Sequence, residues 1–365
     1  MSTTRILVIQ GRPPYPMLLG GAARVTHRLL LALSKRPEVE VMWIGGASPV
    51  QLAQFVPGRD AWDALGIHAT AAMETGLSFD MGYRCVATTK LNVEYDRQLA
   101  SFQPTLVWGQ LEGAPGLVRE AVSKGYASMQ YMMDCVYDAA TVRSTALLGT
   151  KFVGLSQYIA DRIGKDAGGK AKVVYPIFDF DPGDRDLSTD NRETGYVLMI
   201  NPHPLKGIET FLGFAALLPN VNFRLQQSWP MHLADVKGLS NRLADFPNVD
   251  FQRAVPDMRP VYRGASALVV PSVWEEGFGM VVPEAQAAGV PVIASRRGGL
   301  PESVGGGGVL VDEYQDAASW ARIIEELLHS RDFYSNLRTA GWSSVERPQF
   351  SESAVVKSFL RGIAS

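Results

Sequence analysis

The sequence is poor in the residues that build cross-linked or metal-held scaffolds. Its 365 residues include two cysteines and five histidines. Cys85 and Cys135 are too few for a disulfide framework, and no cysteine or histidine group has the spacing of zinc ligands. The sequence also lacks a Gly-x-Ser-x-Gly element and a cysteine–histidine arrangement of the kind that supports covalent catalysis. A disulfide-stapled scaffold is therefore excluded, and nothing points to a structural zinc site.

Long apolar runs and a charge excess are missing as well. The longest apolar runs, such as 265–271, fall well short of the roughly 18 residues that a membrane-spanning helix needs. A net charge of −2 gives no support for nucleic-acid binding. The segment Thr4-Arg-Ile-Leu-Val-Ile-Gln10 is typical of a buried first strand rather than a secretion signal. We therefore expect a cytoplasmic protein with no transmembrane segment.

The chain instead has the composition of an ordinary globular protein, with 46% apolar and 20% charged residues. Its length favours two domains. Apolar runs that read as strands alternate with helical patterns, which predicts parallel sheets. In the first half we expect strands at 5–10, 39–44, 105–108, 127–132, 152–155 and 173–176, and helices at 22–34 and from Gln157, capped by Ser156. In the second half we expect strands at 195–200, 222–225, 265–270 and 291–295, and helices at 208–217, 317–328 and 352–363.

A polar stretch at 179–193, rich in aspartate, separates the two alternations and is the best candidate for a hinge. The simplest assembly of this pattern is an α/β protein with two doubly wound, Rossmann-like domains that face a cleft. We place the first domain at 1–182 and the second at 183–349. Asp179-Phe-Asp181 could be taken for a metal-binding Asp-x-Asp element, but the two-domain pattern argues against the fold that uses it.

The most informative run extends from Pro271 to Ser295. A strand leads into it, Gly277 and Gly279 let backbone approach a ligand closely, and a short helix follows. The free N–H groups of such a helix start suit a phosphate. The carboxylates of Glu276 and Glu284 would repel that phosphate and instead suit sugar hydroxyls, so the run predicts a sugar-nucleotide site. The alternative is that both glutamates are ordinary solvated or helix-capping acids.

This run resembles the donor-site signature of retaining glycosyltransferases of family 4, within the glycosyl transferases group 1, which have the GT-B fold. The family's Glu-x7-Glu is here Glu276-Gly-Phe-Gly-Met-Val-Val-Pro-Glu284. The match continues through Ala294-Ser-Arg-Arg-Gly-Gly-Leu-Pro-Glu302 and Gly308-Val-Leu-Val-Asp312. The match to the family is specific over residues 250–312. Over most of the rest of the chain it is weaker, but the matching segments follow in the same order.

The resemblance implies roles for residues on the second domain. Lys206, in Asn201-Pro-His-Pro-Leu-Lys-Gly207, would neutralise the donor's β-phosphate, although a solvated lysine beside a turn glycine is the alternative. Asn201 stands where the family usually has an arginine, so one cationic contact is missing or comes from elsewhere. Glu276 would hold the transferred sugar and Glu284 the ribose. The remaining donor-binding positions are Gly277, Phe278, Gly279 and Met280, with 251–258 near the base.

On the first domain the resemblance is weaker. Gly20 and Gly21 resemble the family's glycine loop, which approaches the donor phosphate and the acceptor. Gln110 occupies the position of a histidine found in many members, and glutamine cannot take a proton at neutral pH. Front-face displacement, in which the departing phosphate accepts the acceptor's proton, needs no protein base at this position and is compatible with a glutamine there. Glu112, Asp134 and Asp138 are further acids in this region, and Arg24, His27 and Arg28 form a cluster for which contact with a membrane or an acidic acceptor is a minority interpretation.

By resemblance, the chain is a retaining, metal-independent hexosyltransferase. It would move a sugar from a nucleoside-diphosphate sugar to a small-molecule, glycan or lipid-linked acceptor, without a cofactor. The last helix, 350–365, would pack back on the first domain. Two other functions stay open: a sugar-nucleotide epimerase or hydrolase on the same fold, and a non-catalytic nucleotide-sugar binding protein.

Overall fold

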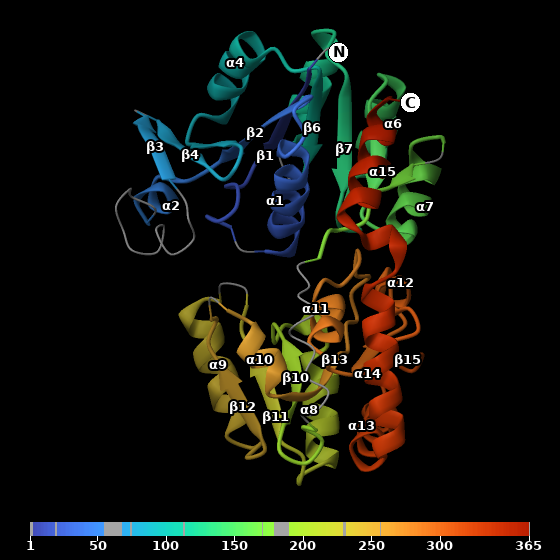
Figure 1. The fold of residues 1–365 in the computed structure, drawn as a ribbon. Coiled ribbons are helices and arrows are strands. Elements are labelled where there is room, and N and C mark those ends of the chain that lie inside the picture. The colour runs from blue at the N-terminus through green and yellow to red at the C-terminus, as the bar shows by residue number, and fades with distance from the viewer. Residues whose placement is uncertain are drawn as a thin grey trace. The chain divides into compact units, whose positions relative to one another are not determined.

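The computed structural model describes residues 3–18, 20–54, 68–73, 75–111, 114–169, 171–178, 190–228, 231–255 and 257–364. The chain divides into two compact units, which are described separately (Figure 1). Unit 1 comprises Met1–Ile177 and Ser351–Ser365, and unit 2 comprises Phe178–Phe350. Most of the predicted hinge, including Asp179 and Asp181, lies outside the described residues.

Unit 1 is built on one mixed sheet with the strand order β3-β4-β5-β2-β1-β6-β7-β8-β9. The strands are β1 (Thr4–Gln10), β2 (Val39–Gly46), β3 (His68–Met73), β4 (Gly76–Asp80), β5 (Arg84–Thr88), β6 (Leu106–Gln110), β7 (Ser128–Met132), β8 (Lys151–Gly154) and β9 (Lys172–Val173). The helices are α1 (Gly21–Ser34), α2 (Pro49–Gln54), α4 (Leu91–Phe102), α5 (Ala114–Ser123), α6 (Ala139–Leu147), α7 (Gln157–Asp166) and α15 (Glu352–Ala364). Pairing is parallel except at β3–β4 and β4–β5.

Helices cover both faces of this sheet, which is why its central strands are almost continuously apolar. In β1, Leu7 and Ile9 belong to a core that includes side chains of α4 and α5. On the other face, Trp108 of β6 packs against Phe359 of α15, with ring centroids 5.1 Å apart. Helix α15 also bonds to β9, where Ser358 Oγ donates to Val173 O at 2.8 Å. The C-terminal helix is therefore part of the core of unit 1.

Unit 2 has a wholly parallel sheet with the order β12-β11-β10-β13-β14-β15. Its strands are β10 (Tyr196–Ile200), β11 (Phe223–Gln226), β12 (Val249–Gln252), β13 (Ala265–Val270), β14 (Val292–Ser295) and β15 (Gly308–Val311). Its helices are η2 (Pro204–Lys206), α8 (Ile208–Leu217), α9 (Leu233–Leu243), α10 (Arg259–Arg263), α11 (Val281–Ala287), α12 (Leu300–Val304), α13 (Ala317–His329), α14 (Arg331–Val345) and η3 (Pro348–Phe350).

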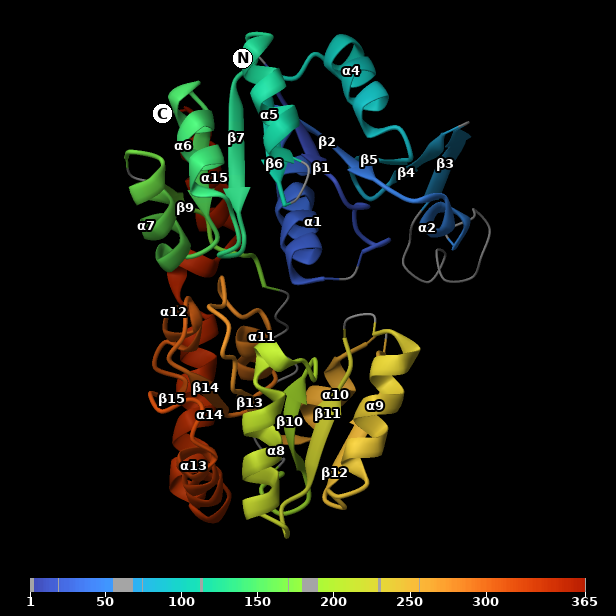
Figure 2. The same cartoon turned by 180° about the vertical axis from the view of Figure 1, so that it is seen from behind.

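Two separate cores lie on the two faces of this second sheet. One joins the strands to α8, α9, α13 and α14, and the other joins them to α10, α11 and α12. Figure 2 shows the strands and helices of this unit from the other side. The strand order runs outward in both directions from β10 and β13, so the switch in winding direction lies between these two strands. Open α/β sheets bind ligands at this switch, outside the carboxyl ends of the strands. The predicted fold class, two doubly wound Rossmann-like α/β domains, is confirmed.

Many predicted elements are confirmed. The predicted helix 208–217 coincides with α8, and Ser156 caps α7, its Oγ accepting from Ile159 N at 3.2 Å. The antiparallel extension β3–β4–β5 and helix α14 were not predicted from the sequence. The proposed boundary between 182 and 183 lies outside the described residues.

Candidate functional site

Two loops meet at the carboxyl edge of β10 and β13. The loop after β10 carries Lys206, and the loop after β13 carries Glu276. The backbone N–H groups of Val273 and Trp274 both donate to Leu205 O, at 3.2 and 3.1 Å. Because neighbouring parallel strands end at one edge, residues 70 apart in sequence come together here.

The centre of this site is an ion pair that is mostly shielded from solvent. Lys206 Nζ lies 2.5 Å from Glu276 Oε1, and the two side chains are 18% and 11% exposed. Ser272 Oγ donates to the same oxygen at 2.6 Å, and Ser272 is fully buried. Within the described part of the chain, no hydrogen bond reaches the second oxygen, Oε2, of Glu276. This oxygen is the one that a ligand hydroxyl can use.

Glycines hold the two loops at this separation. Gly207 has φ +85°, and a side chain there would overlap Pro271 O. Gly298 has φ +56°, and a side chain there would overlap the backbone of Glu276. Gly299 N donates to Glu276 O at 2.7 Å. Gly298 and Gly299 therefore support the loop that carries Glu276.

The predicted donor-loop residue Phe278 has a buried side chain. Its ring packs against Phe178 and Phe350, with centroid distances of 5.9 and 5.8 Å, and the residue is 1% exposed. Gly279 has φ +78°, which favours glycine, and Met280 is the half-buried residue before α11. At Phe278, therefore, the backbone rather than the side chain is suited to contact a ligand.

Glu284 lies in the first turn of α11 and is half-buried. The phenol of Tyr262, on α10, donates to Glu284 Oε2 at 2.7 Å. Tyr262 itself is 4% exposed. Sequence reasoning missed both Tyr262 and Ser272, since nothing in their spacing shows that they reach the two glutamates.

Asn201 is buried and uncharged at the position where an arginine was expected. It has φ +61°, its Oδ1 accepts from Ser228 N at 2.8 Å, and its own N–H donates to Gln226 O at 2.8 Å. Asparagine tolerates this left-handed conformation better than most residues. Asn201 therefore shapes the end of β10 and adds no charge to Lys206.

In unit 1, Gly20 and Gly21 start α1. Gly20 is the residue before the helix, with φ −67° and ψ 160°, and a Cβ placed on it would have no atom within 4 Å. Packing of the described residues therefore does not require a glycine at this position. The open space leaves room for a ligand to approach the backbone.

Gln110 ends β6 in a fully buried hydrogen-bond chain. Its Oε1 accepts from Thr26 Oγ1 on α1 at 2.7 Å, and its Nε2 donates to Gln10 Oε1 on β1 at 2.7 Å. Gln10 Nε2 donates in turn to Pro13 O at 2.7 Å, which ties down the loop after β1. The side chains of Gln10, Thr26 and Gln110 are all fully buried. In this structure Gln110 joins β6, β1 and α1, and its catalytic role stays a prediction.

The basic cluster on α1 is engaged locally. The His27 ring stacks on Tyr15, with centroids 4.5 Å apart, and its Nδ1 lies 2.9 Å from Tyr83 OH. Burial raises the pKa of Tyr83 well above its usual value, so this phenol stays neutral. Arg28 donates to Ile177 O at 3.3 Å, while Arg24 is half-buried. Contact of this cluster with a membrane or an acidic acceptor stays a prediction.

The remaining predicted acids have local partners or lie outside the described residues. Asp138 caps α6, accepting from Thr141 N at 2.7 Å, and this hydrogen-bonded threonine lowers the pKa of its carboxyl. Asp134 Oδ1 accepts from Val136 N at 2.9 Å. Glu112 belongs to the undescribed part of the chain. In the described ranges, no three His, Cys, Asp or Glu side chains form a group that could hold a metal ion, and no helix is both long and apolar enough to cross a membrane.

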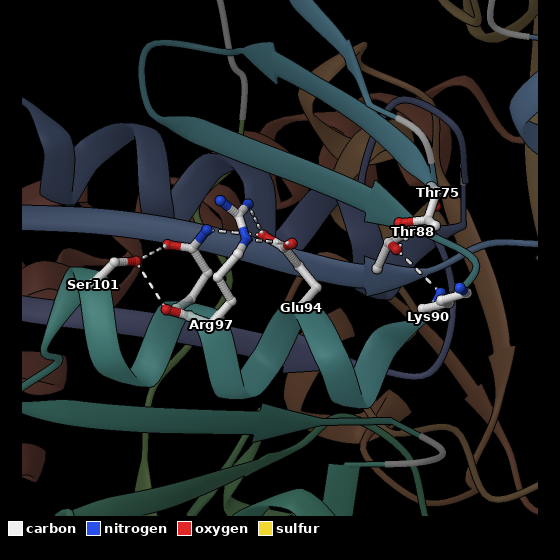
Figure 3. Close-up of polar contacts among 7 residues, drawn as sticks. Thr75, Thr88, Lys90, Glu94, Arg97 and Ser101 are labelled. Carbon is white, nitrogen blue, oxygen red and sulfur yellow. Dashed lines mark hydrogen bonds and ion pairs between the residues drawn. The ribbon is translucent and has the colours of Figure 1, made fainter.

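A separate polar cluster on α4 is self-contained (Figure 3). The buried Glu94 Oε1 accepts from Arg97 at 2.6 Å and from Gln98 at 2.8 Å. At the start of the same helix, Thr88 Oγ1 donates to Thr75 O at 3.0 Å and accepts from Lys90 N at 3.1 Å. The buried charge of Glu94 is therefore neutralised and hydrogen-bonded by residues of its own helix, so the cluster has a structural role.

Comparison with known proteins agrees with this arrangement. Residues 197–330 match the family model described as glycosyl transferases group 1. A D-inositol 3-phosphate glycosyltransferase of Mycobacterium sp. (strain KMS) is 38% identical over 177 residues, and the Mycolicibacterium smegmatis enzyme of that name is 38% identical over 178. Each alignment covers 43% of this chain and 39% of the relative, so the chain spans well under half the length of these relatives.

Solved structures match nearly the whole chain. Sucrose-phosphate synthase from Thermosynechococcus elongatus aligns over 98% of both chains, with a TM-score of 0.77 and 17% identity. The Anabaena protein HepE, solved in complex with UDP and glucose, aligns over 99% of both chains, with a TM-score of 0.72 and 16% identity. The fold is therefore that of the GT-B proteins. Within it, the segment that matches the model of the glycosyl transferases group 1, residues 197–330, carries Lys206, Glu276 and Glu284.

The resemblance seen in the sequence is thereby confirmed at the level of this group. Membership of family 4 in particular stays a prediction, and so does a cleft between the two units.

Proposed function

We propose that the chain is a retaining glycosyltransferase that uses a nucleoside-diphosphate sugar. The observation that carries this proposal is the Lys206–Glu276 pair, which places a cation and a carboxylate at the switch point of unit 2. A cation suits a diphosphate, and the open oxygen of Glu276 suits a sugar hydroxyl. Both lie inside the segment that matches the group 1 family.

In the proposed reaction the bond between the sugar's anomeric carbon and the diphosphate breaks, and a bond to the acceptor oxygen forms on the same face. Lys206 stabilises the charge that develops on the departing diphosphate. The acceptor's proton passes to that departing phosphate, since Gln110 offers no base. Glu276 and Glu284 orient the sugar and the ribose. Because Lys206 supplies the countercharge, we propose that transfer needs no metal.

The similar proteins indicate which donors and acceptors should be tested first. HepE was solved with UDP and glucose, and the mycobacterial relatives are named D-inositol 3-phosphate glycosyltransferase. We therefore propose UDP-glucose as the first donor and phosphorylated polyols beside lipid-linked sugars as the first acceptors. We further propose that the enzyme acts in the cytoplasm, with membrane contact confined to its surface.

The test is calorimetric titration of the chain with UDP, ADP, GDP and their glucose conjugates, followed by transfer assays with the donor that binds. Lys206→Ala should lower kcat/KM by about 10²–10³-fold, the effect of losing one charge-stabilising group. The matched control is Lys237→Ala, which removes an exposed lysine on α9 and should leave kcat/KM unchanged. Transfer that survives chelation of divalent metals supports the metal-independent route.

Three other outcomes would redirect the assignment. A new sugar isomer formed without acceptor indicates an epimerase, and free sugar alone indicates a hydrolase. Binding of a nucleotide sugar without release to water or to any acceptor indicates a binding protein. Equal kcat/KM for Lys206→Ala and the wild type removes Lys206 from the site.

A further inference from the structure

We infer that Tyr262 is a positioning residue that orients Glu284 toward the ribose of the donor. This inference rests on the proposed function, in which Glu284 binds that ribose. The carrying observation is the 2.7 Å hydrogen bond from the phenol of Tyr262 to Glu284 Oε2. The two residues are 22 apart in sequence and lie on different helices.

The phenol is held in place by the core. Tyr262 is 4% exposed, and its ring packs in the cluster that contains Val282, Ala285 and Leu300. Its backbone N–H donates to Met258 O at 3.0 Å, which anchors the start of α10. A ring fixed by packing has already lost its rotational freedom, so its hydroxyl orients a partner at little further entropic cost.

The partner, in contrast, needs orientation. Glu284 is half-buried in the first turn of α11, and a glutamate side chain has three rotatable bonds. A carboxylate accepts up to about four hydrogen bonds, and Tyr262 occupies one of them on Oε2. This bond orders the Glu284 side chain before a ligand arrives, so less conformational entropy is lost when ribose hydroxyls bind it.

The same device occurs at the other glutamate. Ser272, also buried, donates to one oxygen of Glu276 and leaves the second oxygen open. Each of the two carboxylates that the proposed function assigns to the donor thus accepts a hydrogen bond from a buried hydroxyl. Glu284 differs in that its orienting hydroxyl comes from another helix. Tyr262 lies on α10, before β13 in the sequence, whereas Glu284 lies on α11, after β13.

The experiment compares Tyr262→Phe with the wild type in calorimetric titrations of UDP and of 2′,3′-dideoxy-UDP, or of the ADP or GDP pair if that base binds best. The substitution removes one oxygen atom and keeps the packed ring. We expect the Kd for UDP to rise about tenfold, the size of one hydrogen bond to a charged group. The Kd for the dideoxy nucleotide, which has no hydroxyls for Glu284, should change less than about twofold.

The matched control is Tyr196→Phe. Tyr196 OH donates to Val261 O at 2.6 Å, so this variant also loses one tyrosine hydrogen bond, next to Tyr262 in space but without contact to Glu284. It should leave both Kd values unchanged. A Glu284→Gln variant should make the Tyr262→Phe substitution nearly silent for UDP, since the oriented carboxylate is then absent.

The outcomes separate the inference from the proposed function. If the wild type binds none of the nucleoside diphosphates, both are wrong. If it binds UDP and Tyr262→Phe weakens UDP and the dideoxy nucleotide equally, or weakens neither, the positioning role is wrong while the donor site stands.

Discussion

Lys206 and Ser272 bind the same oxygen of Glu276, at 2.5 and 2.6 Å, and leave the other oxygen open. A partly buried carboxylate is costly unless it is paired and hydrogen-bonded. Here both partners stabilise it from one side. The site is therefore already arranged, with the open oxygen available for a sugar hydroxyl. Pre-organisation of this kind lowers the cost of ordering groups when the donor binds.

Ser272→Ala tests whether this arrangement matters for turnover. The substitution keeps the ion pair but removes the hydroxyl that fixes its orientation. We expect kcat/KM for the nucleotide sugar to fall about tenfold, in keeping with one charge-assisted hydrogen bond, while the Kd of the nucleoside diphosphate alone stays unchanged. Initial-rate kinetics and calorimetry on the same preparation check both statements.

Ser295→Ala is the control for this comparison. Ser295 is also fully buried, at the end of the neighbouring strand, and its Oγ donates to Ser272 O at 2.7 Å rather than to Glu276. Both variants should lose about 1 kcal/mol of unfolding free energy. A similar fall of kcat/KM in both would show that Ser272 acts only through loop stability.

Gly20→Ala separates a functional glycine from a structural one. The backbone at Gly20 suits alanine, and an added Cβ meets open space, so unfolding free energy should change by less than about 1 kcal/mol. If a ligand approaches this backbone, kcat/KM should fall at least about tenfold, because a methyl group then blocks the contact.

Gly238→Ala provides the comparison, because a Cβ at that exposed position on α9 also meets nothing within 4 Å. It should leave kcat/KM unchanged. Unaltered kinetics for Gly20→Ala would remove the Gly20 loop from the substrate site. Gly207→Ala should instead unfold readily, since its positive φ and its contact with Pro271 exclude a side chain.

The family resemblance assigned Lys206 and Glu276 to one donor site, and the sheet explains why they meet: both follow apolar strands, and parallel strands end at a common edge. The range of α8 was predictable for a related reason, since its apolar residues lie between a glycine turn and Pro219. These features depend on local periodicity and on one rule of topology.

Other features depend on contacts that periodicity does not encode. Tyr262 reaches Glu284 only because α10 and α11 pack on one face of β13. Helix α14 was missed because serine, glycine and threonine interrupt its pattern, and packing rather than propensity stabilises it. The β3–β5 extension was missed because an antiparallel addition breaks the strand–helix alternation on which the fold prediction rested.

The final prediction concerns Gln110, which is fully buried between Gln10 and Thr26. Gln110→Ala leaves an acceptor of Gln10 and the hydroxyl of Thr26 without their partner, so unit 1 should lose about 2–4 kcal/mol of stability. The double variant Thr26→Val/Gln110→Ala should lose less stability than the two single variants added together, because both substitutions break the same hydrogen bond. Gln157→Ala, on the exposed start of α7, should cost under about 0.5 kcal/mol. Hydrogen exchange of the β1 and β6 amides in urea measures each value. If Gln110→Ala is as stable as the wild type but transfers no sugar, its role is catalytic rather than structural.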